Sequence, residues 1–136
     1  MKFPEDLLYS EDHEWLRLTQ EKTPDGRRIG IVGISDFAQS ELGELVYVEV
    51  ETVGETLGSH AVFGTLEAVK TTSDLFMPVG GEVLAFNPAL DEKGGDNPAL
   101  INSDPYGEGW IIRIAVSDES ETAHLMKADT YAAKVG

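Results

Sequence analysis

The first residue whose type and position suggest chemistry is Lys70. It begins a short polar segment, residues 70–74, between two apolar runs, and no other lysine or arginine occurs between Arg28 and Lys93. Strand-forming residues on both sides of a polar loop predict a β-hairpin that carries this lysine. A lone loop lysine is usually a solvated surface charge. The residue type alone therefore does not assign a function to Lys70. The surrounding sequence must show whether it is functional or an ordinary surface charge.

The other reactive side chains do not form the pattern of an independent enzyme. His13, His60 and His124 are far apart and lack the spacing of metal ligands. Alternating acids such as Glu49 and Glu51 usually mark the solvated face of a strand. No nucleophile, base and oxyanion-binding group occur together, and the chain has no cysteine for a thiolate metal site or a catalytic thiol. We therefore expect a non-catalytic protein without a metal site.

Length and charge limit the class of protein and its partners. The 136 residues suffice for one domain, and no linker divides residues 1–136. The net charge is −15, which argues against binding to nucleic acid or anionic membranes and favours partners with a basic surface. No apolar run approaches the roughly 20 residues of a membrane span. The acidic N-terminus lacks a signal or transit pattern, so we expect a cytoplasmic monomer, although a processed organellar protein would look the same.

A repeated motif frames the lysine. Residues 54–57 and 81–84 share the pattern Gly-Glu-x-Leu, and Lys70 lies close to their midpoint. Two strand units related by a pseudo-twofold axis and joined by a hairpin would leave this pattern. The motif is short enough to arise by chance, so it supports the hairpin without establishing it.

Four segments together resemble the glycine cleavage system H-protein family. They are residues 64–83, Tyr9 with His13-Glu14-Trp15, residues 30–39 and residues 101–110. In the first segment, Glu67 precedes Lys70 by three residues, and a Pro-x-x-Gly-Glu-Val return strand follows. The family more often has Ser and Ala where this chain has Ala68 and Thr71. The segments follow the family's order, so the resemblance covers about residues 9–131.

Many short strands with glycine turns predict a flattened β barrel or sandwich. The resemblance refines this fold to the mainly β barrel-sandwich hybrid of lipoyl and biotinyl carriers. Ser35 and Gly43 are suited to cap a helix over residues 36–42. Helical turns are expected at Asn87-Pro88 and Asn97-Pro98, and one or two C-terminal helices at about residues 118–134. The clearest expected strands are residues 15–18, 29–34, 45–50 and 110–115.

The resemblance implies a lipoylated carrier. Lys70 would form an amide with lipoic acid, attached by a lipoate ligase or a lipoyl/octanoyl transferase that reads Glu67. The arm would accept an aminomethyl group from the pyridoxal-phosphate glycine decarboxylase (P-protein). It would present that group to the tetrahydrofolate-dependent aminomethyltransferase (T-protein). Dihydrolipoamide dehydrogenase (L-protein) would then reoxidise the dihydrolipoyl form of the arm.

The resemblance also implies a cleft for the loaded arm near the His13-Glu14-Trp15 segment. Glu14, together with Asp12 and Asp74, would hold the ammonium group of the arm by charge-assisted hydrogen bonds. The alternative is that Glu14 and Asp12 are ordinary surface acids.

Two other functions stay open from the sequence. Biotin carriers usually have Met on both sides of the lysine, and 2-oxo-acid dehydrogenase domains usually have Asp before it, whereas Val69 and Thr71 flank Lys70 here. A lipoyl donor or relay protein would use the same lysine, so the sequence does not separate that role from glycine cleavage. It also assigns no role to the glycine-rich loop at Gly94 and Gly95.

Overall fold

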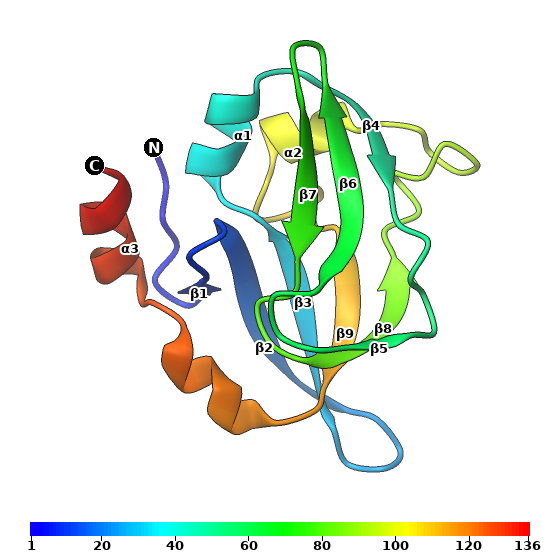
Figure 1. The fold of residues 1–136 in the computed structure, drawn as a ribbon, viewed down its shortest axis with the longest axis vertical. Coiled ribbons are helices and arrows are strands. Elements are labelled where there is room, and N and C mark those ends of the chain that lie inside the picture. Colours follow the sequence, from blue (N-terminus) through cyan, green and yellow to red (C-terminus); the bar gives the residue numbers. More distant parts are fainter.

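The computed structural model describes residues 1–136 as two antiparallel β-sheets with short helices around them (Figure 1). The six-stranded sheet contains, in spatial order, β1 (Leu8–Tyr9), β2 (Glu14–Lys22), β3 (Arg28–Ile34), β9 (Ile112–Val116), β8 (Gly81–Phe86) and β5 (Thr56–Leu57). The three-stranded sheet contains β4 (Leu45–Glu49), β6 (Val62–Ala68) and β7 (Thr72–Phe76). The helices are α1 (Asp36–Leu42), α2 (Ala99–Ser103), the 3-10 helix η1 (Glu119–His124) and α3 (Ala128–Val135).

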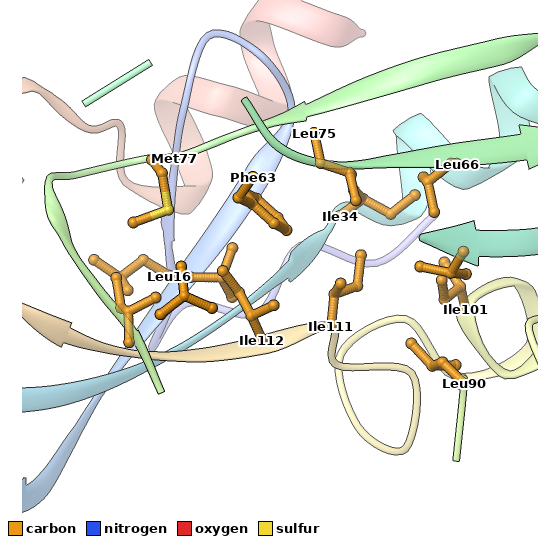
Figure 2. Packing of buried hydrophobic residues seen from close by; sticks show 14 of the residues in the cluster. Leu16, Ile34, Phe63, Leu66, Leu75, Met77, Leu90, Ile101, Ile111 and Ile112 are labelled. Atoms are coloured by element: carbon orange, nitrogen blue, oxygen red, sulfur yellow. The ribbon is translucent and has the colours of Figure 1, made fainter. Parts of the chain in front are cut away.

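The main core lies between the two sheets. Phe63, Leu66 and Leu75 of the smaller sheet lie across from Leu16 and Ile112 of the larger one, and all five are almost fully buried (Figure 2). Burying one such side chain contributes about 1.5–3 kcal/mol. The predicted mainly β, two-layered architecture is confirmed, and the strand pairing does not close the two sheets into one barrel.

Helix α1 has the predicted bounds and caps. Ser35 Oγ accepts a hydrogen bond from the Ala38 N–H at 3.1 Å. Gly43 ends the helix with φ +79°, a conformation that L side chains rarely adopt. Asn102 of α2 fixes this end, because its Nδ2 donates to the Gly43 carbonyl at 2.8 Å and its Oδ1 accepts from the Leu45 N–H at 3.0 Å. The helix is therefore held at both ends.

The β6–β7 hairpin is confirmed, but its loop is shorter than the predicted residues 70–74. Residues 72–74 belong to β7, where Thr72 pairs with Glu67 and Asp74 pairs with Thr65. β7 is an edge strand of the small sheet, so its polar side chains keep access to solvent while its backbone pairs with β6. Polar composition therefore does not mark the end of this strand.

The two Gly-Glu-x-Leu motifs become neighbouring strands. β5 pairs with the start of β8, with Thr56 opposite Glu82 and Leu57 opposite Gly81. The hairpin that carries Lys70 leaves the body between these two paired segments. The motif thus marks the base of the hairpin.

Near the second turn region the predicted cap at Asn87 is found, but one strand boundary is wrong. Asn87 Oδ1 accepts from the Ala89 N–H at 3.0 Å and the Asn87 carbonyl accepts from the Leu90 N–H at 3.1 Å, which gives a single turn over residues 88–90. The Asn87 Nδ2 also donates to the carbonyls of Glu108 and Trp110. The Trp110 carbonyl is thereby occupied, and β9 begins at Ile112 instead of at residue 110. A helical turn does follow Asn97-Pro98, as α2.

The C-terminal helices η1 and α3 lie close to the predicted range of about 118–134. α3 packs beside β1 near both chain ends (Figure 1). A second core cluster forms there from Leu7, Tyr9, Trp15, Ala128 and Tyr131. None of the helices combines the length and the apolar character that a membrane span requires.

Candidate functional site

Lys70 lies at the tip of the β6–β7 hairpin, which projects beyond the body of the protein next to α1 (Figure 1). The turn is tight, because the Ala68 N–H donates to the Thr71 carbonyl at 2.7 Å. The Val69 N–H donates to the Glu44 carbonyl at 3.1 Å, which ties the tip to the segment after α1. Lys70 is exposed and takes part in none of the ion pairs of the structure. Its amine is therefore free to react while the backbone beneath it is held.

Glu67 lies on β6 and is exposed. It pairs with Thr72 across the hairpin and also lies opposite Tyr47 of β4. A protein that binds the hairpin tip would meet this carboxylate on the same projecting strand. The predicted recognition residue is thus accessible.

A cavity of about 390 Å³ opens between the two sheets and α1, and its lining combines acids with apolar side chains. Asp12, His13 and Glu14 come from the turn before β2 and its first residue, and Ser73 and Asp74 come from β7. Ile34, Phe37, Ala38, Leu42, Leu66 and Leu75 form the apolar part of the wall, and Glu41 completes it. The structure therefore brings the three predicted cleft acids, Glu14, Asp12 and Asp74, to one cavity.

The cavity and the hairpin tip share β7. Ser73 lines the cavity and lies three residues after Lys70. Along an extended strand, three residues span roughly 10 Å. A long side chain or a group attached to Lys70 is therefore within reach of the cavity along the same strand.

Glu14 is buried, with only 2% of its surface exposed, so it is not an ordinary surface acid. The Ser10 hydroxyl donates to its Oε1 at 3.1 Å, and the Phe76 N–H of β7 donates to its Oε2 at 3.3 Å. No arginine or lysine forms an ion pair with it. Burial raises the pKa of Glu14 from its ordinary 4.5 to about 8; the two hydrogen bonds oppose this rise and nearby Asp12 adds to it.

Asp12 and Asp74 are more accessible than Glu14. Asp12 is half-buried, and its Oδ2 lies 3.3 Å from His60 Nδ1. Asp74 is exposed on the edge strand β7. The cavity thus has one buried carboxyl and two carboxylates nearer the solvent. No cluster of three or more His, Asp and Glu side chains is arranged to hold a metal ion.

Comparison with known proteins assigns the family. Residues 7–136 match the sequence model of the family described as Glycine cleavage H-protein. The chain belongs to the glycine cleavage H-protein family. It is 47% identical over 135 residues to the glycine cleavage system H protein of Bacteroides thetaiotaomicron, covering 99% of this chain and 98% of that protein. The H protein of Chlorobium limicola is 46% identical over 136 residues, covering 100% and 99% of the two chains.

A solved structure of an H protein has the same fold. The crystal structure of a glycine cleavage system H protein from Mycobacterium marinum superposes with a TM-score of 0.77 and 38% sequence identity. The match covers 96% of this chain and 97% of that one. The resemblance drawn from the sequence motifs is therefore confirmed at the level of family and fold.

For this H-protein family member, sequence reasoning did not find several groups that support the residues of the cavity. The Ser10 hydroxyl holds Glu14 from four residues before it in the chain, within one turn. The Phe76 N–H, which also holds Glu14, carries no signal in the sequence because its role depends on how β7 lies over β2. His60 has φ +69° and meets Asp12 from a loop 48 residues away. Tyr131 was expected only as an apolar position of a C-terminal helix, yet its hydroxyl contacts His13.

Proposed function

We propose that this chain is the lipoylated, non-catalytic carrier of a glycine cleavage system, with Lys70 as the attachment residue. The observation that carries the proposal is the position of Lys70 in a member of the H-protein family. Its amine is exposed on a tight turn and free of ion pairs, on the strand that leads into an acid-lined cavity. An amine in this setting can form an amide without loss of a structural contact.

The residues present fit a lipoyl-lysine arm. Such an arm is largely apolar, and six apolar side chains line the cavity. Its cargo carries a cationic amine, and the same cavity contains a buried carboxyl with two further carboxylates near it. When bound, the lipoyl group would supply a disulfide whose cleavage gives one sulfur bonded to the aminomethyl group of glycine and one thiol, so that the group passes from a glycine decarboxylase to an aminomethyltransferase, and dihydrolipoamide dehydrogenase would oxidise the two thiols left after this transfer to the disulfide.

Glu14 would act on the cationic end of the cargo. Its pKa of about 8 means that its carboxyl holds a proton at neutral pH while no cation is near. An ammonium group that enters the cavity favours the ionised carboxyl, so Glu14 would release its proton and accept a charge-assisted hydrogen bond. Asp12 and Asp74 would add negative potential to the same cavity.

The remaining partners follow from the same proposal. Glu67 would be read by the lipoate ligase or lipoyl/octanoyl transferase that modifies Lys70, since it is exposed on the strand that leads to the tip. The acidic surface, with a net charge of −15, would dock on basic surfaces of the decarboxylase and the aminomethyltransferase. The monomeric state and the cytoplasmic location remain predictions.

A reconstituted reaction tests the proposal. The chain is lipoylated, then mixed with purified decarboxylase, aminomethyltransferase, dihydrolipoamide dehydrogenase, tetrahydrofolate, glycine and NAD, and NADH formation is followed. We expect glycine-dependent NADH formation with the lipoylated chain and none with the unmodified chain. A fully lipoylated chain that supports no reaction but passes its lipoyl group to other acceptor proteins would replace the carrier function with that of a lipoyl donor.

A further inference from the structure

The C-terminal helix α3 contributes a buried tyrosine that reaches the wall of the cavity. Tyr131 is 0% exposed, and its ring stacks on Tyr9 at 4.7 Å with an interplanar angle of 3°. Its hydroxyl lies 2.8 Å from His13 Nδ1 and 2.7 Å from Ser35 Oγ. A hydroxyl has one proton and two lone pairs, so it can satisfy both contacts at once.

The two partners of the Tyr131 hydroxyl lie side by side at the cavity. His13 lies between Asp12 and Glu14 and lines the cavity itself. Ser35, whose N–H donates to the His13 carbonyl at 2.9 Å, caps α1, and the α1 side chains Phe37 and Ala38 also line the cavity. The hydroxyl therefore adds a side-chain link between the segment that bears the acids and the start of α1.

His13 has a backbone conformation that needs such support. Its φ is +72°, in the left-handed region that a residue with a side chain rarely adopts. The backbone of His13 is fixed by hydrogen bonds to the backbone of Ser10 and Ser35. Its imidazole is fixed by the Tyr131 hydroxyl and packs next to Phe37, with 5.2 Å between the two ring centres. Strained residues persist only where the surrounding structure fixes them.

We propose, on the basis of the carrier function proposed above, that Tyr131 is a positioning residue for the cavity: its hydroxyl clamps His13 to the start of α1 and thereby fixes the position of the neighbouring Glu14. The C-terminal helix is then part of the machinery that retains the loaded arm, although it contributes no side chain to the cavity lining. The competing explanation is that Tyr131 only anchors α3 through its buried ring.

A pair of matched variants separates these explanations. Tyr131→Phe removes the hydroxyl and keeps the ring that stacks on Tyr9. Tyr9→Phe makes the same chemical change in the same aromatic cluster, but the Tyr9 hydroxyl donates to the Pro4 carbonyl at 2.8 Å and does not touch the cavity. Both variants lose one buried hydroxyl, so a purely structural role predicts similar effects.

The first readout uses the unmodified chain. We expect Tyr131→Phe to shift the pH midpoint of the Glu14 carboxyl carbon, because this midpoint reports on the position of Glu14, which the hydroxyl does not touch. The ¹⁵N resonance of His13 Nδ1 confirms that the hydrogen bond is lost, but it shifts under either explanation because Nδ1 is the partner of the hydroxyl. The titratable groups that line the cavity with Glu14 are Asp12, His13, Glu41 and Asp74, with Tyr131 behind His13, and both variants keep all of them except the deleted hydroxyl. Tyr9→Phe should leave the Glu14 midpoint as in the wild type. A wild-type Glu14 midpoint in Tyr131→Phe would overturn the proposal.

The second readout uses the lipoylated and loaded chain without partner enzymes. Tyr131→Phe should shorten the lifetime of the aminomethyl group roughly fivefold, the ratio expected from the loss of one hydrogen bond. Equal lifetimes for Tyr131→Phe and Tyr9→Phe would overturn the positioning role. If the decarboxylase does not load the wild-type chain, the carrier function is overturned instead. The resonance test would still show whether the Tyr131 hydroxyl positions Glu14. If Tyr131→Phe fails to fold, Ser35→Gly removes the hydroxyl at the other end of the same chain of hydrogen bonds, at a smaller cost to the α1 cap than Ala would have, and should shift the Glu14 midpoint in the same direction.

Discussion

Among the carboxyl groups of the protein, that of Glu14 has its pKa changed most by its surroundings. Glu14 is the first residue of β2, but it accepts a hydrogen bond from β7 of the other sheet and has no cationic partner. Its pKa of about 8 follows from burial and means that the folded protein holds this proton more tightly than the unfolded chain does. A group of this kind stabilises the fold most below its unfolded pKa and loses that contribution as the pH rises through its folded pKa.

We therefore expect Glu14→Gln to change how stability depends on pH. Between pH about 4.5 and about 8, the wild type should lose free energy of unfolding relative to the variant, by on the order of 5 kcal/mol at most. Gln keeps the shape of the protonated acid but does not ionise, so the general repulsion of the acidic surface is common to both proteins and cancels. Urea unfolding at several pH values measures the difference. Parallel pH profiles for the two proteins would show that Glu14 titrates normally.

Glu67 represents the opposite case, an exposed acid for which we propose a role in recognition by the lipoylating enzyme. Glu67→Ala should change the free energy of unfolding by no more than about 0.5 kcal/mol, because surface substitutions rarely cost more. It should nevertheless slow lipoylation of Lys70 by a ligase. Initial rates of lipoylation and the melting temperature of each protein are the measurements. A large drop in melting temperature with a normal rate of lipoylation would contradict the assignment.

At this scale the sequence led to Lys70, the proposed attachment residue, but not to the surroundings of Glu14. Lys70 and Glu67 lie on one continuous hairpin, so their spacing along the chain already reflects their spacing in the structure. The burial of Glu14 depends on β7, which lies 62 residues away in the sequence. That contact arises only when the two sheets pack, and no local pattern records it.

At the scale of elements, the pairing of β2 with β3 supports the acidic side of the cavity. Trp15 follows Glu14, lies opposite Gly33 on β3, and donates through its Nε1 to the Pro105 carbonyl at 3.1 Å. A Cβ at Gly33 would lie 2.6 Å from the Trp15 ring, closer than side-chain atoms approach one another. The absence of a side chain at Gly33 therefore leaves room for the tryptophan.

Gly33→Ala should displace the Trp15 ring and destabilise the fold by about 1–3 kcal/mol, the usual cost of overpacking a core. Tryptophan fluorescence should report the displacement and urea unfolding should report the cost. Gly58→Ala is the control, because a Cβ at that glycine meets nothing within 4 Å. Equal stability of the two variants would mean that the core around Trp15 adapts without strain.

Elements with strong local signals could be predicted from the sequence, and elements defined by distant contacts could not. α1 carries its own capping residues, Ser35 and Gly43, and its bounds were correct. β7 was partly missed because residues 72–74 are polar, and only pairing with β6 makes them a strand. Asn87 caps the turn that follows it, as the local sequence indicates, but the bonds of its Nδ2 to carbonyls more than 20 residues further along the chain have no local signal.

For the whole molecule, we propose that the excess of acidic side chains steers association with partners. The net charge of −15 gives a field that basic partner surfaces would follow during docking. Salt screens such a field, since the Debye length falls from about 10 Å at 0.1 M to about 3 Å at 1 M. A contact with the carboxyl of Glu14, which is buried, should be screened much less.

We expect the affinity of the lipoylated chain for the decarboxylase to fall steeply between 0.05 M and 0.5 M salt, a range over which the Debye length shortens severalfold. The lifetime of the aminomethyl group on the isolated loaded chain should change little over the same range, because Glu14, the carboxyl proposed to hold its ammonium group, is buried. Binding by surface plasmon resonance and decay of the loaded species by mass spectrometry are the two measurements. A salt-independent affinity would show that docking relies on apolar contacts.

The overall topology was predictable as a class but not in its pairing. The spacing of short strands and glycine turns indicated a two-layered β fold, and the motif order indicated the family. The pairing of β3 with β9 joins segments about 80 residues apart, and it depends on the packing of the complete core. Local patterns predict strands, whereas their order in the sheet is a property of the whole chain.

The central claim is that Lys70 is the single attachment site of the lipoyl group. The most direct test treats the purified chain with lipoate ligase, ATP and lipoate, and maps the modification by peptide mass spectrometry. We predict one lipoyl group, on the peptide that contains Lys70, and none on Lys70→Arg, which should keep the fold because the side chain is exposed and makes no ion pair. A lipoyl group on Lys93, or on Lys70→Arg at the wild-type level, would contradict it.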